Sequence, residues 1–124
     1  MKHVNLILFI LLGLAFLFFG VQKFTGPNPI FAKIALNSGI DLFEPVIRML
    51  TGAGELTTGV LLLLPKTRKF GVLLGLPILI GAIGFHLSPW LGINVPEVGG
   101  HWLFFTAVGM LIVNLILFFR FRTI

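Results

Sequence analysis

The sequence predicts an all-α membrane protein: an up-down-up-down bundle of four transmembrane helices, with a short amphipathic interfacial helix between the first and second spans. Of the 124 residues, 57% are hydrophobic and only 10% are charged. A soluble domain of this size buries only about 60–70% of its chain surface, so it could not hide so much apolar area. Long apolar runs separated by short polar stretches are instead typical of helices in lipid. We expect residues 1–124 to form a single membrane domain.

The first predicted span covers residues 4–21. It follows the basic start Met1-Lys2-His3, as the apolar part of a signal peptide would. The run nevertheless ends at Gly20-Val21-Gln22-Lys23 without a small-x-small cleavage pattern, so we expect it to remain in the membrane as a helix.

A short helix is predicted in the connection that follows. Asn28 before Pro29 is typical of a helix start, where asparagine caps the backbone and proline occupies the first turn. Ser38-Gly39 can end this helix. Its apolar side chains fall on one face, so we expect it to lie in the outer headgroup region of the membrane.

The second predicted span covers residues 42–64. Asp41 and Glu44 have the spacing of a capping box, so we interpret them as capping residues rather than as a catalytic carboxylate pair. Pro65 ends the span and opens a basic hairpin. The remaining spans cover residues 70–88 and 101–119.

The positive charges predict how the bundle is oriented. Cations gather at the ends of the spans, and the side that has more of them is expected to face the cytoplasm. That side holds Lys2, Lys66, Arg68, Lys69, Arg120 and Arg122, and the other side holds Lys23, Lys33 and Arg48. We therefore predict a multi-pass protein of the cytoplasmic (inner) membrane, with both termini in the cytoplasm.

Glu55 is the only acidic residue inside an apolar run. An ionised residue at the centre of a membrane helix costs about 2.5–3.5 kcal/mol on insertion scales, so such residues usually face the bundle interior and have a function. Arg48, Thr51 and Thr58 share its helix face by their spacing. The alternative is a structural role, in which the carboxyl group is hydrogen-bonded to a neighbouring helix.

Counting about 1.5 Å of rise per residue places Lys23, Arg48, His86 and His101 in one layer near the outer end of the bundle. Glu55 lies deeper by this count, near the bilayer centre and out of easy reach of Arg48. We therefore predict an outward-facing pocket with a cationic and histidine rim and a carboxylate floor. The predicted ligand-binding residues are Lys23, Arg48, Thr51, Glu55, His86 and His101, with Glu55 as the candidate proton donor or acceptor.

Simpler interpretations of the rim stay open. Lys23 and Arg48 can extend outward to the lipid headgroups, and for Lys23 we favour this interpretation. His86 and His101 can be interfacial histidines that bond to loop carbonyls.

The composition argues against several kinds of chemistry. The chain has no cysteine, so it forms neither a disulfide nor a thiol-based redox centre of its own. No motif for a metal or a covalently bound cofactor occurs, and we expect no metal site. The net charge of +5 does not indicate nucleic-acid binding, because the cations sit at the ends of apolar runs rather than on a polar face.

Short motifs resemble the DoxX family of four-helix membrane proteins. They are Gly20-x-x-Lys23, then Gly54-Glu55-Leu56-x-x-Gly59-x-Leu61-Leu62-Leu63, then Arg68 in the basic hairpin, and Ala82 with His86. The resemblance covers nearly the whole chain and implies the four-helix architecture. It also implies Lys23, Glu55, Arg68 and His86 as marked positions, with Arg68 outside the pocket. For chemistry it implies links to thiosulfate oxidation with quinone as acceptor, to redox-stress complexes, or to the assembly of partner proteins.

Three classes of function are compatible with these residues. The first, which we favour, is a redox-associated membrane protein that holds a quinone-like or small anionic ligand around Glu55, with or without catalysis. Its electrons would come from a substrate or partner. The second is a structural or assembly subunit that binds a membrane protein partner or a second copy of the chain. The third, an ion or proton carrier, is disfavoured because only Asn5 and Asn114 continue a polar path towards the inside.

Overall fold

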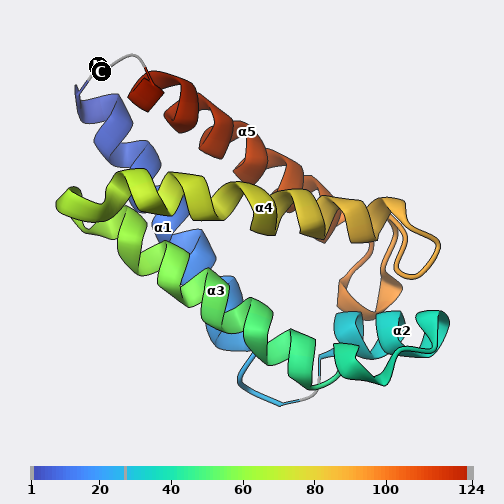
Figure 1. The fold of residues 1–124 in the computed structure, drawn as a ribbon. Helices are drawn as coiled ribbons and strands as arrows, with labels where there is room; N and C mark the ends of the chain where they lie inside the picture. Colours follow the sequence, from blue (N-terminus) through green and yellow to red (C-terminus); the bar gives the residue numbers. More distant parts are fainter. Residues whose placement is uncertain (1, 27, 123–124) are drawn as a thin grey trace.

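The computed structural model describes residues 2–26 and 28–122, and this part of the chain is helical, with no strand (Figure 1). The elements are α1 (Lys2–Gln22), α2 (Pro29–Ser38), the short 3-10 helix η1 (Asp41–Phe43), α3 (Val46–Leu63), η2 (Pro65–Thr67), α4 (Arg68–Leu87), η3 (Pro96–Val98) and α5 (Trp102–Arg122). The prediction of an all-α chain is therefore confirmed for the described residues.

Within these residues, four helical stretches are long and apolar enough to cross a membrane, and they correspond to the predicted spans. Many of their large apolar side chains point away from the bundle, among them Leu11, Phe18, Ile80 and Phe105. An exposed apolar surface of this extent is typical of a membrane-facing protein. The fold is consistent with a multi-pass membrane protein. The position of α2 at the interface and the orientation of the termini stay predictions, and the side chains of Lys2 and Arg122 lie outside the described part.

Helix α1 packs closely against α3 because glycines face each other at two heights. A Cβ atom at Gly59 would come 2.9 Å from the carbonyl oxygen of Gly13, and one at Gly52 would come 3.2 Å from that of Gly20. The glycines of each helix are seven residues apart, which places them on one face. The first glycine of α1, Gly13, pairs with the second of α3, Gly59, and Gly20 pairs with Gly52, so α1 and α3 run antiparallel.

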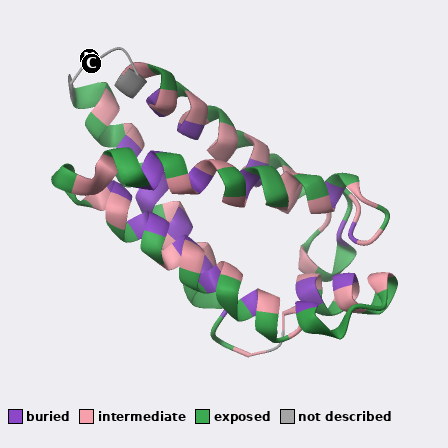
Figure 2. Ribbon diagram, in the orientation of Figure 1, coloured by how far each residue is buried: buried purple, intermediate pink, exposed green. Residues whose placement is uncertain are grey.

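Contacts at the end of the bundle with the basic hairpin join distant parts of the chain. The Arg68 guanidinium lies 5.0 Å from the centre of the Phe9 ring, and it also donates a hydrogen bond to the carbonyl oxygen of Leu62. The Asn114 side chain donates to the carbonyl oxygen of Val72 at 3.0 Å and so ties α5 to α4. Figure 2 shows buried residues concentrated where α1, α3 and α4 meet.

Helix α2 begins and ends as predicted. The Asn28 side chain accepts a hydrogen bond from the Ile30 backbone at 2.9 Å, Pro29 occupies the first turn, and Gly39 follows the last turn with a φ of 75°. The apolar face of α2 packs into a buried cluster, and Figure 2 shows buried residues here too. Its members are Phe31, Ile34, Phe43, Leu91 and Val95.

The predicted capping box at the start of the second span is wrong. Residues Asp41–Phe43 form a separate short helix, and neither η1 nor α3 has a side-chain cap. Glu44 instead binds Arg48, with 2.6 Å between Oε1 and Nε, and accepts a hydrogen bond from the Asn28 backbone at 3.2 Å. Pro45 separates the two helices, because a proline ring cannot continue regular hydrogen bonding, and Glu44 is left to face Arg48 one turn later.

The glycine contacts between α1 and α3 predict a selective sensitivity to added volume. Gly59→Ala should lower the free energy of unfolding by about 1–3 kcal/mol, because the new methyl group would lie 2.9 Å from the Gly13 carbonyl oxygen as well as 2.7 Å from the Leu17 side chain. Gly109→Ala is the matched control, since a Cβ there has nothing within 4 Å. Unfolding in detergent measures both. Equal effects at the two positions would contradict the close helix contact.

Candidate functional site

An ion pair between α1 and α3 lies inside the bundle. The Nζ atom of Lys23 lies 2.8 Å from Oε1 of Glu55, and both side chains are about nine-tenths buried. Lys23 directly follows α1, and its ammonium group also donates to the carbonyl oxygen of Phe19 at 3.3 Å. A cation beside the last carbonyls of a helix is favoured by the helix dipole. Glu55, seven residues beyond Arg48 on α3, receives its counter-charge from another helix.

This contact was not predicted from the sequence. We expected the Lys23 side chain to extend outward, and Lys23 and Glu55 to lie in different layers. The close contact between α1 and α3 places Lys23 beside Gly52, where an added Cβ would lie 2.6 Å from the Lys23 Cβ. Glu55 is three residues further along α3, a rise of about 4.5 Å. Two long side chains that point towards each other span this separation. Counting residues along a helix locates Cα atoms but not the direction in which long side chains extend.

Lys23 and Glu55 both keep hydrogen-bonding capacity beyond their own contact. An ammonium group has three donors, and the described structure uses two of them, towards Phe19 and Glu55. Glu55 Oε1 is buried and has Lys23 as its ionic partner, whereas no described protein group donates to Oε2. The pair therefore offers one free donor and one free carboxylate oxygen to a ligand.

His86 lies near the end of α4 and is buried. Its Nδ1 atom is 2.9 Å from the carbonyl oxygen of Gly92. Because a carbonyl only accepts hydrogen bonds, Nδ1 donates in this contact, and Nε2 is the ring nitrogen left for a second hydrogen bond. The interpretation as a histidine bonded to a loop carbonyl is thus confirmed for His86, and its second nitrogen stays available.

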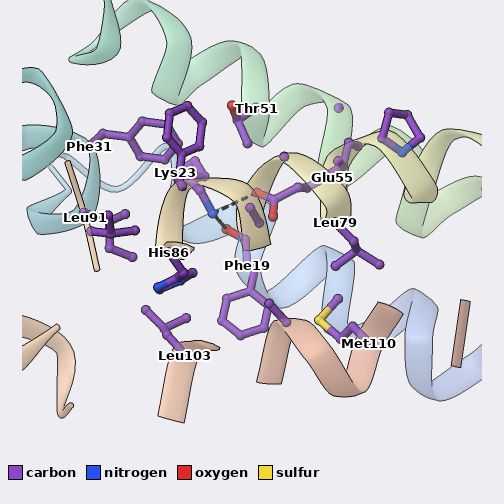
Figure 3. Close-up of a pocket in the computed structure, with 18 of the residues that line it drawn as sticks. Phe19, Lys23, Phe31, Thr51, Glu55, Leu79, His86, Leu91, Leu103 and Met110 are labelled. Carbon is purple, nitrogen blue, oxygen red and sulfur yellow. Dashed lines mark hydrogen bonds and ion pairs between the residues drawn. The ribbon is translucent and has the colours of Figure 1, made fainter. Parts of the chain in front are cut away.

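A cavity of about 350 Å³ brings these groups together (Figure 3). Figure 3 shows the Lys23 and Glu55 side chains turned towards each other, with apolar side chains from the surrounding helices around them. Most of the lining is apolar. The polar residues among the described lining are Lys23, Thr51, Glu55, His86 and Thr106. Thr106 had not been predicted; its hydroxyl group donates to the carbonyl oxygen of Trp102, one turn earlier in α5.

Two predicted ligand-binding residues lie outside this cavity. Arg48 is buried, but its guanidinium is bound to Glu44 and to the backbone carbonyl of Lys23. His101 is exposed and lies beside the ring of Phe105. The structure thus brings four of the six predicted residues to the described cavity, and the cationic rim formed by Arg48 is absent from it.

The end of the cavity beside α2 also differs from the predicted open mouth. Ile30, Phe31 and Ile34 of α2 contribute to the lining, and Phe31 and Ile34 are themselves buried. Helix α2 therefore acts as an apolar cover over this end. The sequence predicted the amphipathic face of α2 but assigned it to lipid rather than to the cavity.

Among residues 2–26 and 28–122, no cluster of three or more histidine, cysteine, aspartate or glutamate side chains is arranged to hold a metal ion. The described polar groups of the cavity can donate and accept hydrogen bonds and can exchange protons.

The comparisons with known proteins identify no relative: no family model, no curated protein and no solved structure matches the chain. The site is therefore interpreted from its own geometry.

Removing one partner of the buried ion pair should cost more than removing both. Lys23→Met or Glu55→Met leaves a charge without its counter-charge and should lower the free energy of unfolding by about 3–5 kcal/mol. The double variant Lys23→Met/Glu55→Met should recover most of this loss, because neither charge remains. Unfolding in detergent micelles provides the measurement.

The pair between Lys33 and Glu97 is the control for this cycle. Its atoms are 3.6 Å apart and its side chains are more exposed. Lys33→Met should change stability by less than about 1 kcal/mol. If the losses at Lys23 and Glu55 simply add in the double variant, the two residues do not act as a pair.

Proposed function

We propose that this protein is a membrane-embedded ligand-binding protein of the DoxX type, associated with redox chemistry, whose cavity holds the polar headgroup of a quinone-like molecule. The observation that carries the proposal is the combination of buried polar groups with unused hydrogen-bonding capacity and an otherwise apolar lining. Such a combination is typical of small-molecule sites, in which a few polar groups fix orientation and apolar contacts supply most of the affinity.

Charge balance favours an uncharged headgroup over a small anion. The charges of Lys23 and Glu55 compensate each other at 2.8 Å. Arg48, the cation that would attract an anion, is already bound to Glu44. A carbonyl oxygen of the ligand can accept from Lys23, and a ligand hydroxyl group can donate to Glu55 or His86. Quinone and quinol headgroups carry these groups, and Glu55 is the candidate proton donor or acceptor.

The DoxX resemblance adds support of a different kind. Of the positions that it marks, Lys23, Glu55 and His86 line one cavity, although they come from different helices. Arg68 lies at the other end of the bundle, against Phe9. This separation agrees with the interpretation of Arg68 as a residue outside the pocket.

A structural subunit is the second candidate function. The Lys23–Glu55 pair joins α1 to α3, as a helix-packing lock would, and the outer faces of the spans leave apolar surface for a partner. In this alternative the cavity has no specific ligand.

The double variant Lys23→Met/Glu55→Met separates the two candidates. If the cavity binds quinones, this variant should fold nearly as well as the wild type but bind decylubiquinone at least about tenfold more weakly in lipid nanodiscs. His86→Ala should also weaken binding, and His101→Ala, outside the cavity, should not. Unchanged quinone binding in the double variant would favour the structural subunit.

For orientation we propose four crossings in up-down-up-down order in the cytoplasmic membrane, with both termini inside and α2 in the outer interface. The chain has no cysteine, so single cysteines can be labelled without background. Lys66→Cys should be modified only from the cytoplasmic side and Asn94→Cys only from the outside, because the excess of cations marks the inner end. Labelling of both positions from one side would contradict this topology.

A further inference from the structure

The cavity opens sideways between two helices. Among the described residues that line it, the exposed ones are Leu50 of α3 and Pro77 and Gly81 of α4. The lining contributed by α1, α2 and α5 is buried or half-buried. The opening therefore lies between α3 and α4.

Helices α3 and α4 separate progressively from their hairpin. Near the hairpin a Cβ at Gly71 would come 2.8 Å from the Leu62 side chain. Further along, a Cβ at Gly54 would make only ordinary contact with Ile78, at 3.4 Å. At Gly81 a Cβ would have nothing within 4 Å. Figure 1 shows the same divergence of the two ribbons, and glycine at position 81 leaves no side chain to fill the opening.

This opening is at membrane depth, whereas the outer end of the cavity is covered. Leu50 and Gly81 both lie inside candidate spans. The apolar face of α2 covers the end that would otherwise lead to water, and it is held there by its buried cluster with η1 and the loop after α4. A ligand dissolved in the bilayer has the more direct path.

We propose that the ligand is an uncharged amphiphile with a hydrocarbon chain, that it reaches the cavity from the bilayer between α3 and α4, and that its chain stays in the opening beside Leu50 and Gly81. This inference rests on the proposed function and specifies the ligand class and its route. The headgroup is uncharged because Lys23 and Glu55 already neutralise each other. A volume of about 350 Å³ is at the small end for ligand sites, so a headgroup fits and a long chain projects outward.

The route predicts that filling the opening affects only ligands with a chain. The ligands are decylubiquinone and the same quinone headgroup without a chain, and binding is measured in lipid nanodiscs. Gly81→Trp should weaken binding of decylubiquinone at least about tenfold and leave the chainless quinone nearly unchanged. Gly84→Trp is the matched control, because it is on the same helix, has equally open space and does not line the cavity.

A second pair of variants tests the opening from the facing helix. Leu50→Trp should act like Gly81→Trp, and its control is Met49→Trp, an exposed neighbour outside the cavity lining. Melting temperatures identify any variant that fails to fold, and the remaining pair then decides. The lateral route would be overturned if a variant lost affinity equally for both quinones or for neither. The same loss of affinity in a control variant would also overturn it. A wild-type protein that binds neither quinone would instead overturn the proposed function.

Discussion

The Lys23–Glu55 ion pair is the constraint on which the rest of the structure depends. Two opposite charges inside an apolar bundle are tolerable only if they stay in contact, because each alone would have to be removed from water without compensation. The pair therefore fixes the end of α1 against the middle of α3. It also gives the apolar cavity a polar wall, with donor and acceptor capacity left over for a ligand.

The glycine faces of α1 and α3 make this contact geometrically available. Close approach at Gly20 and Gly52 brings Lys23 within reach of the facing helix, whereas the more loosely packed α3–α4 interface near Gly81 leaves space. Glycine thus has opposite effects at two positions. Gly52 faces the backbone of α1 and allows close packing, whereas Gly81 has no neighbour and leaves the cavity open. Small residues at helix contacts are the usual means by which membrane helices approach closely.

Much of the fold could be predicted from the sequence, because apolar runs, prolines and the Asn28 cap are local signals. The site was predicted less well. Lys23, Thr51, Glu55 and His86 line the cavity, although Lys23 had been expected to extend outward. Arg48 is bound to Glu44, and His101 does not line the cavity. These outcomes depend on contacts between segments. Counting residues along a single helix gives no information about such contacts. One signal was available and unused, namely the seven-residue glycine spacing in both α1 and α3.

Solid-state NMR can test the central contact directly in lipid bilayers, by measuring the dipolar coupling between a ¹⁵N-labelled Lys23 ammonium and a ¹³C-labelled Glu55 carboxyl group. We expect a strong coupling, because the nitrogen atom lies 2.8 Å from a carboxylate oxygen. Labelling only Lys33 and Glu97 should give a weaker and more dynamic signal, since that pair is longer and more exposed. A Lys23 ammonium without detectable coupling to Glu55, or one in contact with lipid phosphate, would contradict the buried ion pair.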